Sequence, residues 1–244
     1  LTATGTRKDN FHFTEDEVES DKRIISGETG GYGIQWTVRG RDVYVLYVEP
    51  GSPAEAAGVT RGMLATHVNG ISVHSAANEQ LATVNTGLFG PELGDSYEIG
   101  FTAASGFTSG EGPDTTITLK SSTIAIHPVH KTAVFETESA KVGYLMLNTF
   151  GIRRAETDLI AAFEDFAAQN INELVLDLRY NGGGFIYIAS QLGYMIGGDN
   201  ARGETFLTLK HNEKLSARDD PIPFYDAYNT DDGPAALPLS LIHI

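Results

Sequence analysis

The chain has 244 residues, enough to bury one large hydrophobic core or two small ones. Its formal net charge of -15 excludes nucleic acid as an expected partner, because binding to phosphates needs a surplus of Lys and Arg. The absence of cysteine excludes a disulfide framework and thiolate chemistry.

The first 28 residues are polar. Their acidic run "TEDEVESD" places Thr14 and Glu17 at the spacing of a helix capping box, which predicts the start of a solvated helix rather than an acidic metal site. No apolar run approaches the length of a membrane span, and no signal-peptide pattern is present. We therefore expect a soluble piece whose export signal has been removed.

Residues 29–122 have the pattern of a small, mostly β module. Short β-like runs, "DVYVLYV" at 42–48 and "TTITLK" at 115–120, are separated by Gly and Pro. Between strand candidates lies "ASGFTSGEGPD", residues 104–114, whose Gly and Ser content predicts a mobile loop without chemistry.

From about residue 123 the pattern changes to α/β. The runs "VGYLMLN" (142–148) and "ELVLDL" (173–178) predict buried strands. Between them, residues 155–170 predict a helix with one apolar face, formed by Leu159, Ile160, Phe163, Phe166 and Ala167. Such a β-α-β unit requires parallel strands with a right-handed crossover. A second helix is expected over "FIYIASQLGYMIGG" (185–198), with a glycine pair suited to its C-cap.

The glycines of "NGGG", residues 181–184, follow the second strand and precede the second helix. Ligands of α/β sheets gather at the carboxyl ends of strands, and glycines there let backbone N–H groups converge on an anion beside a helix N-terminus. The loop lacks the Lys and Ser/Thr of a phosphate loop, so the transient oxyanion of acyl transfer fits better than a bound phosphate. The alternative is a turn that only lets the helix pack on its strand.

Two stretches, "GGYGIQW" (30–36) and "VEPGSPAEAAGVTRGMLATHVNGISV" (48–73), together resemble a PDZ domain of the bacterial protease type. The resemblance implies that a loop binds the terminal carboxylate of a peptide, and that the next strand edge accepts the peptide by β-augmentation. The loop residues implied are Gly31, Tyr32, Gly33 and Ile34. "SAANEQLATVNTGLFG" (75–90) resembles the helix that lines the groove, whereas Met63 stands where the family often has Asp. A Gly-x-Gly loop alone could also be a simple hairpin connection.

This module followed by "GYLMLNTF" and "ELVLDLRYNGGG" resembles the C-terminal processing, or tail-specific, serine peptidases. The resemblance implies hydrolysis of protein C-termini by a serine nucleophile with a lysine base, without metal or cofactor, in the bacterial envelope (periplasmic or membrane-anchored) or in plastids. It implies catalytic roles for Gly183 and Gly184 as oxyanion donors, on a loop braced by Asp177, Arg179 and Asn181.

The sequence departs from that family where the nucleophile is expected. The family carries it in a Thr-x-Ser-Ala-like segment one strand beyond the loop, with the lysine further on, whereas "LPLSLIHI" (237–244) stands about where the preceding strand would run. Ser139 and Lys141 fit a polar turn better than a dyad, and Ser190 falls within the second helix. We expect the chain as given to be inactive by itself. The alternative is a non-catalytic, PDZ-type peptide-binding protein on a peptidase scaffold.

Two remaining motifs carry no predicted site. His127 and His130 flank a proline in an extended stretch and do not share a helical face, which argues against a metal site. "NTDDG" (229–233) is interpreted as a turn, because it lacks the spacing of a calcium loop.

The expected fold class is α/β plus mostly β: a polar segment (1–28), a PDZ-like domain (29–122) and a C-terminally incomplete α/β peptidase core (123–244).

Overall fold

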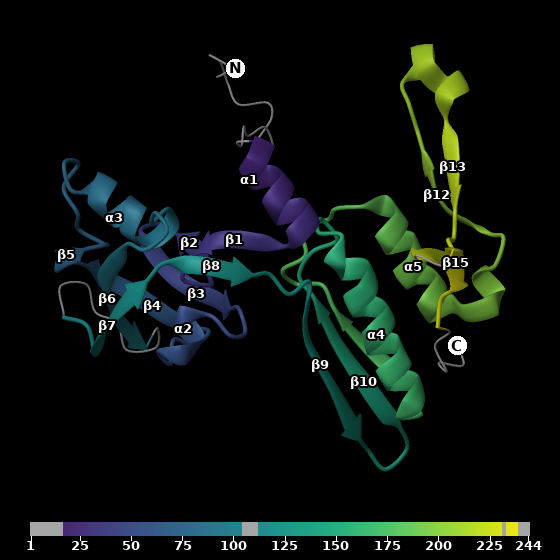
Figure 1. Ribbon diagram of the computed structural model, residues 1–244, viewed down its shortest axis with the longest axis horizontal. Helices are drawn as coiled ribbons and strands as arrows, with labels where there is room; N and C mark the ends of the chain where they lie inside the picture. Colours follow the sequence, from purple (N-terminus) through teal and green to yellow (C-terminus); the bar gives the residue numbers. More distant parts are fainter. Residues whose placement is uncertain (1–16, 104–111, 231–232, 239–244) are drawn as a thin grey trace.

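The computed structural model describes residues 17–103, 112–230 and 233–238 (Figure 1). Two clusters of buried hydrophobic residues organise them, one drawn from residues 32–119 and the other from 145–237. The sequence-predicted capping residue Thr14 and most of the predicted mobile loop, 104–111, lie outside the described residues.

The first unit is built on an antiparallel sheet with strand order β2-β3-β4-β6-β7, and β5 pairs with β4. Its strands are β2 (Ile34–Arg39), β3 (Asp42–Val48), β4 (Met63–Val68), β5 (Ile71–Ser72), β6 (Ser96–Ala103) and β7 (Thr115–Lys120). Two helices accompany it, α2 (Pro53–Ala56) and α3 (Leu81–Phe89). Because β2 ends the strand order, it is an edge strand.

Local sequence explains the turns of this unit. Asn69 and Gly70 both adopt positive φ, 48° and 77°, the combination that a tight hairpin between β4 and β5 requires. Ser52 caps α2 by accepting a hydrogen bond of 3.2 Å from the amide of Glu55. The groove-lining helix expected within 75–90 is shorter than expected and begins only at Leu81, because residues 77–80 form a turn closed by the Gln80 side chain.

A two-stranded ribbon carries the chain into and out of the first unit. It pairs β1 (Glu28–Gly31) with β8 (Ser122–Ala125) in antiparallel fashion. Before it lie α1 (Glu17–Asp21) and one π-helical turn (Lys22–Ser26), which ends at Gly27 with a φ of 68°.

The second unit contains a three-stranded sheet with order β11-β10-β9: β9 (Val129–Glu136), β10 (Lys141–Leu147) and β11 (Glu173–Asp177). β10 and β11 pair in parallel and are connected by α4 (Arg154–Ala168), as the β-α-β pattern predicts. β9, which the sequence pattern did not predict as a strand, pairs antiparallel with β10.

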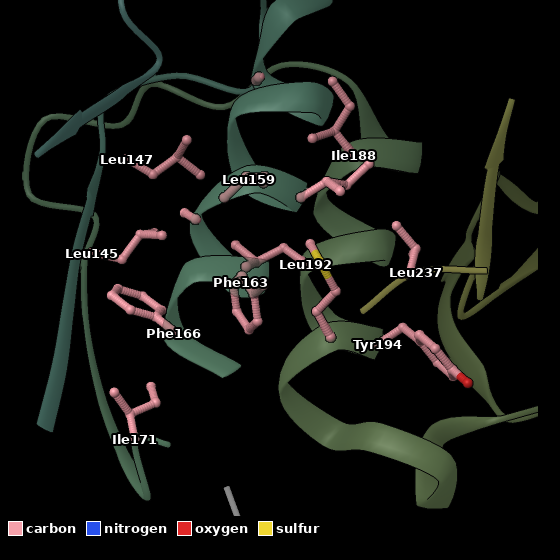
Figure 2. Packing of buried hydrophobic residues seen from close by; sticks show 14 of the residues in the cluster. Leu145, Leu147, Leu159, Phe163, Phe166, Ile171, Ile188, Leu192, Tyr194 and Leu237 are labelled. Atoms are coloured by element: carbon pink, nitrogen blue, oxygen red, sulfur yellow. The ribbon is translucent and has the colours of Figure 1, made fainter. Parts of the chain in front are cut away.

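The core of the second unit lies between this sheet and two helices, α4 and α5 (Ile186–Gly197) (Figure 2). Leu145 and Leu147 point from β10 towards α4, and Ile188 and Leu192 reach the same core from α5. The predicted apolar face of α4 is confirmed: Leu159, Ile160, Phe163 and Phe166 are buried and Ala167 is partly buried. Each such fully buried side chain contributes about 1.5–3 kcal/mol to folding.

The remainder consists of short turns and hairpins: a turn (Gly198–Ala201), β12 (Thr205–Leu209), a turn (Glu213–Arg218), β13 (Asp220–Pro223), β14 (Ala227–Thr230) and β15 (Gly233–Ala236). The β12–β13 ribbon extends away from the body of the molecule (Figure 1).

β11 is the outermost strand of the β11-β10-β9 sheet, and Val175 and Leu178 beside that edge are 49% and 41% exposed. Among the described helices, none has the length and apolar character needed to cross a bilayer.

Candidate functional site

The glycine loop joins the end of β11 to the start of α5, as predicted. Two backbone hydrogen bonds of 2.9 Å tie it to the turn after β10: the Phe150 amide donates to the Gly183 carbonyl, and the Phe185 amide donates to the Phe150 carbonyl. A Cβ on Gly184, whose φ is 139°, would lie 2.1 Å from the backbone N of Gly151. Only glycine therefore fits at position 184.

The amides of the two predicted oxyanion donors differ. The N–H of Gly183 donates to Oδ1 of Asn181 at 2.8 Å, and Nδ2 of Asn181 donates to the Leu147 carbonyl at 3.2 Å. The N–H of Gly184 has no acceptor within the described residues. Of the pair, Gly184 is thus the amide available to an incoming oxygen atom.

An ion pair braces the start of the loop, as expected. Arg179 donates to both carboxylate oxygens of Asp177, with Nη2 to Oδ2 at 2.6 Å and Nε to Oδ1 at 2.9 Å, and the hydroxyl of Tyr144 donates to Oδ2 at 2.6 Å. These donors hold the pKa of the Asp177 carboxyl well below its usual range. The carboxylate is thus fixed in its ionised form at the carboxyl end of β11.

The Gly31–Ile34 loop of the first unit is anchored through its carbonyls. The Tyr32 carbonyl accepts from the Ala54 amide at 3.1 Å, and the Gly33 carbonyl accepts from the Glu49 amide at 2.7 Å. A Cβ on Gly33 would lie 2.2 Å from the Cβ of Ser52, so the close approach of α2 requires glycine there. No described acceptor receives the Tyr32 or Gly33 amide. Both N–H groups are therefore available to an anion.

One cavity of about 410 Å³ extends from the Gly31–Ile34 loop to the turn after β10. Its lining includes the entire Gly31–Ile34 loop, Leu88 and Phe89 from α3, and Thr149 and Ile152 from the turn that follows β10. Thr149 is the neighbour of Phe150, which bonds the glycine loop. The structure therefore places the predicted carboxylate loop and the turn that supports the glycine loop on the same cavity.

A polar and aromatic junction next to this cavity was not anticipated from the sequence. The Tyr47 ring lies 4.9 Å from the His130 ring and 5.7 Å from the Tyr180 ring, centroid to centroid. The guanidinium of Arg61 lies over the Tyr180 ring, 5.5 Å from its centroid. Because Tyr180 directly precedes the "NGGG" run, the first unit touches the glycine loop through aromatic side chains. The only feature of the sequence that indicates this junction is the aromatic residue at position 180.

His127 also belongs to this junction rather than to a metal site. Oε2 of Glu49 accepts from its amide at 3.1 Å and lies 3.3 Å from its Nδ1. Burial raises the pKa of the Glu49 carboxyl, and the hydrogen bonds from His127 oppose that rise. Burial also raises the pKa of the Tyr47 phenol to about 12. Within the described part of the chain, no three metal-ligating side chains come together.

The serines considered earlier have structural roles. Ser139 lies in the β9–β10 turn, where its amide donates to Oγ1 of Thr137, and Lys141 is paired with Glu136 at 3.2 Å. The interpretation of this segment as a polar turn is confirmed. Ser190 is fully buried in α5 and donates to the Pro223 carbonyl at 2.8 Å.

Comparisons with known proteins agree with this arrangement. Residues 141–225 match the model of peptidase family S41. The chain is 34% identical over 176 residues to a carboxyl-terminal-processing protease of Picosynechococcus sp., covering 70% of the chain and 39% of that protein. It is 30% identical over 179 residues to a chloroplastic C-terminal processing peptidase of Tetradesmus obliquus, covering 67% of the chain and 36% of that protein.

A solved structure assigned to the S41 proteases, from Bacteroides fragilis, has the same fold. It aligns with a TM-score of 0.54 at 24% identity, over 91% of this chain and 61% of the other. The chain spans less than two fifths of the length of the two curated relatives above, 39% and 36%. Through residues 141–225, and through its similarity to carboxyl-terminal-processing proteases, the chain belongs to peptidase family S41.

Proposed function

We propose that this chain is the substrate-binding and oxyanion-stabilising part of a serine-type endopeptidase that processes protein C-termini. The observation that carries the proposal is that the cavity lined by the Gly31–Ile34 loop also reaches Thr149, the residue before Phe150, whose backbone bonds the glycine loop. A polypeptide bound in that cavity would end next to the turn that supports the glycine loop.

The first unit acts as a PDZ-like module that captures a free C-terminus. The available amides of Tyr32 and Gly33 suit a terminal carboxylate, and β2 offers an open sheet edge for main-chain pairing. Leu88 and Phe89 supply an apolar wall for the last side chain. The substrate is therefore a protein or peptide with an apolar C-terminal residue.

In the second unit, the Gly184 amide stabilises the charge that develops during acyl transfer. When a serine hydroxyl attacks the scissile carbonyl, the carbonyl oxygen becomes an oxyanion, and an N–H that has no protein acceptor can donate to it. Gly183 supports that amide indirectly, since its own N–H is used by Asn181. The serine nucleophile and lysine base belong to the complete enzyme, outside the residues described here.

The second candidate is a peptide-binding protein without catalysis. It is favoured by the contrast between the cavity at the Gly31–Ile34 loop and the structural roles of Ser139 and Ser190. The sequence that follows residue 244 separates the two functions. A Thr-x-Ser-Ala segment followed by a lysine supports the peptidase, and a stop codon in intact surroundings supports the binding protein. For either function, we propose an exported protein of the bacterial envelope.

The binding function is tested by fluorescence anisotropy with a labelled peptide ending in an apolar residue. We expect micromolar affinity for the free carboxylate and much weaker binding of the same peptide amidated at its C-terminus. Ile34→Asp should abolish binding, whereas Leu215→Ala, on the distant β12–β13 ribbon, should not change it. Equal affinity for the acid and the amide would refute the carboxylate site.

A further inference from the structure

A buried carboxylate lies beside the loop proposed to bind the peptide terminus. Glu49 directly follows β3 and is only 6% exposed. Its amide donates to the Gly33 carbonyl at 2.7 Å, and a Cβ placed on Gly33 would lie 3.5 Å from the Cβ of Glu49. The side chain of Glu49 therefore starts against the residue whose own N–H is available to an anion.

One carboxylate oxygen of Glu49 is held in place and the other is open. Oε2 accepts from the His127 amide at 3.1 Å and lies 3.3 Å from Nδ1 of the same residue. Oε1 accepts no hydrogen bond from the described residues and is not sealed from solvent. Because Glu49 also lines the 410 Å³ cavity, Oε1 is the oxygen that an occupant of the cavity can reach.

Few groups in this cavity can carry a charge. Among the described residues that line it, Arg23 and Glu49 are charged, and Tyr32 and Tyr47 can titrate. Burial raises the pKa of the Tyr47 phenol to about 12 and that of the Tyr32 phenol further, so both stay neutral near pH 7. His127 faces Glu49 from the segment before β9. Glu49 is thus the only acidic group of the lining that titrates in the range of a carboxyl.

A peptide terminus that enters the cavity brings a second carboxylate close to Glu49. Two carboxylates that share a poorly solvated site do not both stay ionised, and one of them binds a proton. The peptide carboxylate stays ionised, because the amides of Tyr32 and Gly33 and the positive charge of Arg23 favour its charged form. Burial already raises the pKa of Glu49, so Glu49 is the group that binds the proton.

We propose that Glu49 couples the capture of a protein C-terminus to the uptake of one proton. The inference rests on the proposed PDZ-like function and adds to it a residue at the end of β3. The proton comes from solvent and is bound by the Glu49 carboxylate, which removes the like charge and gives the cavity an O–H donor. Peptide capture is therefore stronger in mildly acidic than in alkaline solution.

The direction of the pH dependence follows from linkage. Below the pKa of Glu49 in the free protein, the proton is already bound and peptide binding takes up none. Above the pKa of Glu49 in the complex, neither state holds the proton and the affinity is at its lowest. Between these two values the affinity falls by up to tenfold for each unit of pH. The peptide carboxyl, with an ordinary pKa of about 3.5, stays ionised throughout this range.

The test is calorimetric titration of the chain with a peptide that ends in valine, at several pH values from 5 to 8. Each titration is repeated in two buffers with different ionisation enthalpies, which counts the protons taken up. We expect uptake that rises towards one proton within this range, and an affinity that falls at least about fivefold from pH 5 to pH 8.

Three variants identify the group that takes up the proton. Glu49→Gln keeps an oxygen that accepts from the His127 amide but cannot titrate, so its affinity should not change with pH and no proton should be taken up. Glu79→Gln, at an exposed position, is the matched control and should behave as the wild type. His127→Asn keeps the backbone donor to Glu49 and should retain the uptake.

The outcomes are distinguishable. If uptake persists in Glu49→Gln and disappears in His127→Asn, the imidazole takes the proton and the proposal is wrong. If the acid binds more tightly than the amidated peptide but with the same affinity from pH 5 to pH 8, the proton coupling is wrong and the PDZ-like function stands. If acid and amide bind equally, or no peptide binds, the proposed function fails and this inference fails with it.

Discussion

The ring of Tyr47 on β3 lies 5.7 Å from the ring of Tyr180, the residue directly before the "NGGG" run. This contact joins the first unit to the loop that carries Gly184. Aromatic pairs of this kind contribute about 0.5–1.5 kcal/mol beyond their buried area. Through this contact, a movement of the first unit would displace Tyr180 and with it the start of the glycine loop.

The first prediction concerns that contact. Replacing Tyr47 and Tyr180 by leucine, singly and together, should give a coupling free energy of about 0.5–1.5 kcal/mol in urea unfolding. The reason is that each single change removes the same ring contact. Strictly additive effects would show that the two rings do not stabilise each other. Tyr225→Leu combined with Tyr47→Leu is the control pair and should be additive.

The second prediction concerns Gly184. Gly184→Ala should destabilise the fold by about 1–3 kcal/mol or more, because it combines a positive φ with a clash against the backbone of Gly151. Gly182→Ala is the matched control: no atom lies within 4 Å of its Cβ position. Its effect should stay within about 0.5 kcal/mol in the same urea titration. In the complete enzyme, moving the Gly184 amide should reduce turnover on the order of a hundredfold.

If Gly184→Ala unfolds like the wild type, the close approach of the glycine loop to Phe150 is wrong. If stability falls but turnover of the complete enzyme is unchanged, the loop is structural and Gly184 is not an oxyanion donor.

The third prediction follows from the depressed pKa of Asp177. In the folded protein this pKa lies below the value in the unfolded chain, which is about 4. The ionised carboxylate therefore stabilises the fold fully above about pH 4, and this stabilisation is lost as the pH falls through the folded pKa. Asp177→Asn removes this titration. Thermal unfolding from pH 6 down to pH 2 should therefore show a smaller loss of stability in the variant. Parallel profiles for wild type and variant would contradict the prediction.

The fourth prediction concerns Glu49 and has the opposite sign. Burial raises its pKa above the unfolded value, so its contribution to stability is full at low pH and declines as the pH rises through the folded pKa. Glu49→Gln keeps an oxygen to accept from the His127 amide and removes the charge. The stability of the variant relative to the wild type should increase from pH 4 to pH 8, measured by urea unfolding. A constant difference across that range would exclude a buried, titrating Glu49.

Much of the fold followed from local patterns. Period-2 and period-3.6 alternation located β3, β7, β10, α4, β11 and α5, and the glycine positions located the loop and the C-cap of α5. β9 was missed because its sequence "VHKTAVFE" is polar and half-exposed, with little alternation to detect. α3 begins later than the stretch 75–90 suggested, after a turn in which the Gln80 side chain accepts from the Ala77 amide.

The site was predictable only in part. The run of glycines that ends at Gly184 marks an unusual backbone by itself, whereas Gly33 and the bracing of the loop by Asp177 and Arg179 were expected only from the resemblance to known families. That Asn181 uses the Gly183 amide depends on a side-chain rotamer, which a sequence does not reveal. The Tyr47–Tyr180 and Glu49–His127 contacts join segments far apart in the chain, and no local pattern encodes such pairs.

The open edge of β11 affects how the purified chain behaves at high concentration. Within the described part of the chain the outer edge of β11 has no partner strand, and such an edge, with Val175 exposed beside it, is a template for pairing with a second copy. The net charge of -15 opposes this by mutual repulsion, which salt screens over about 10 Å at 0.1 M. Dilute, low-salt solutions should therefore keep the chain dispersed, whereas added salt should favour edge-to-edge aggregates that scatter light.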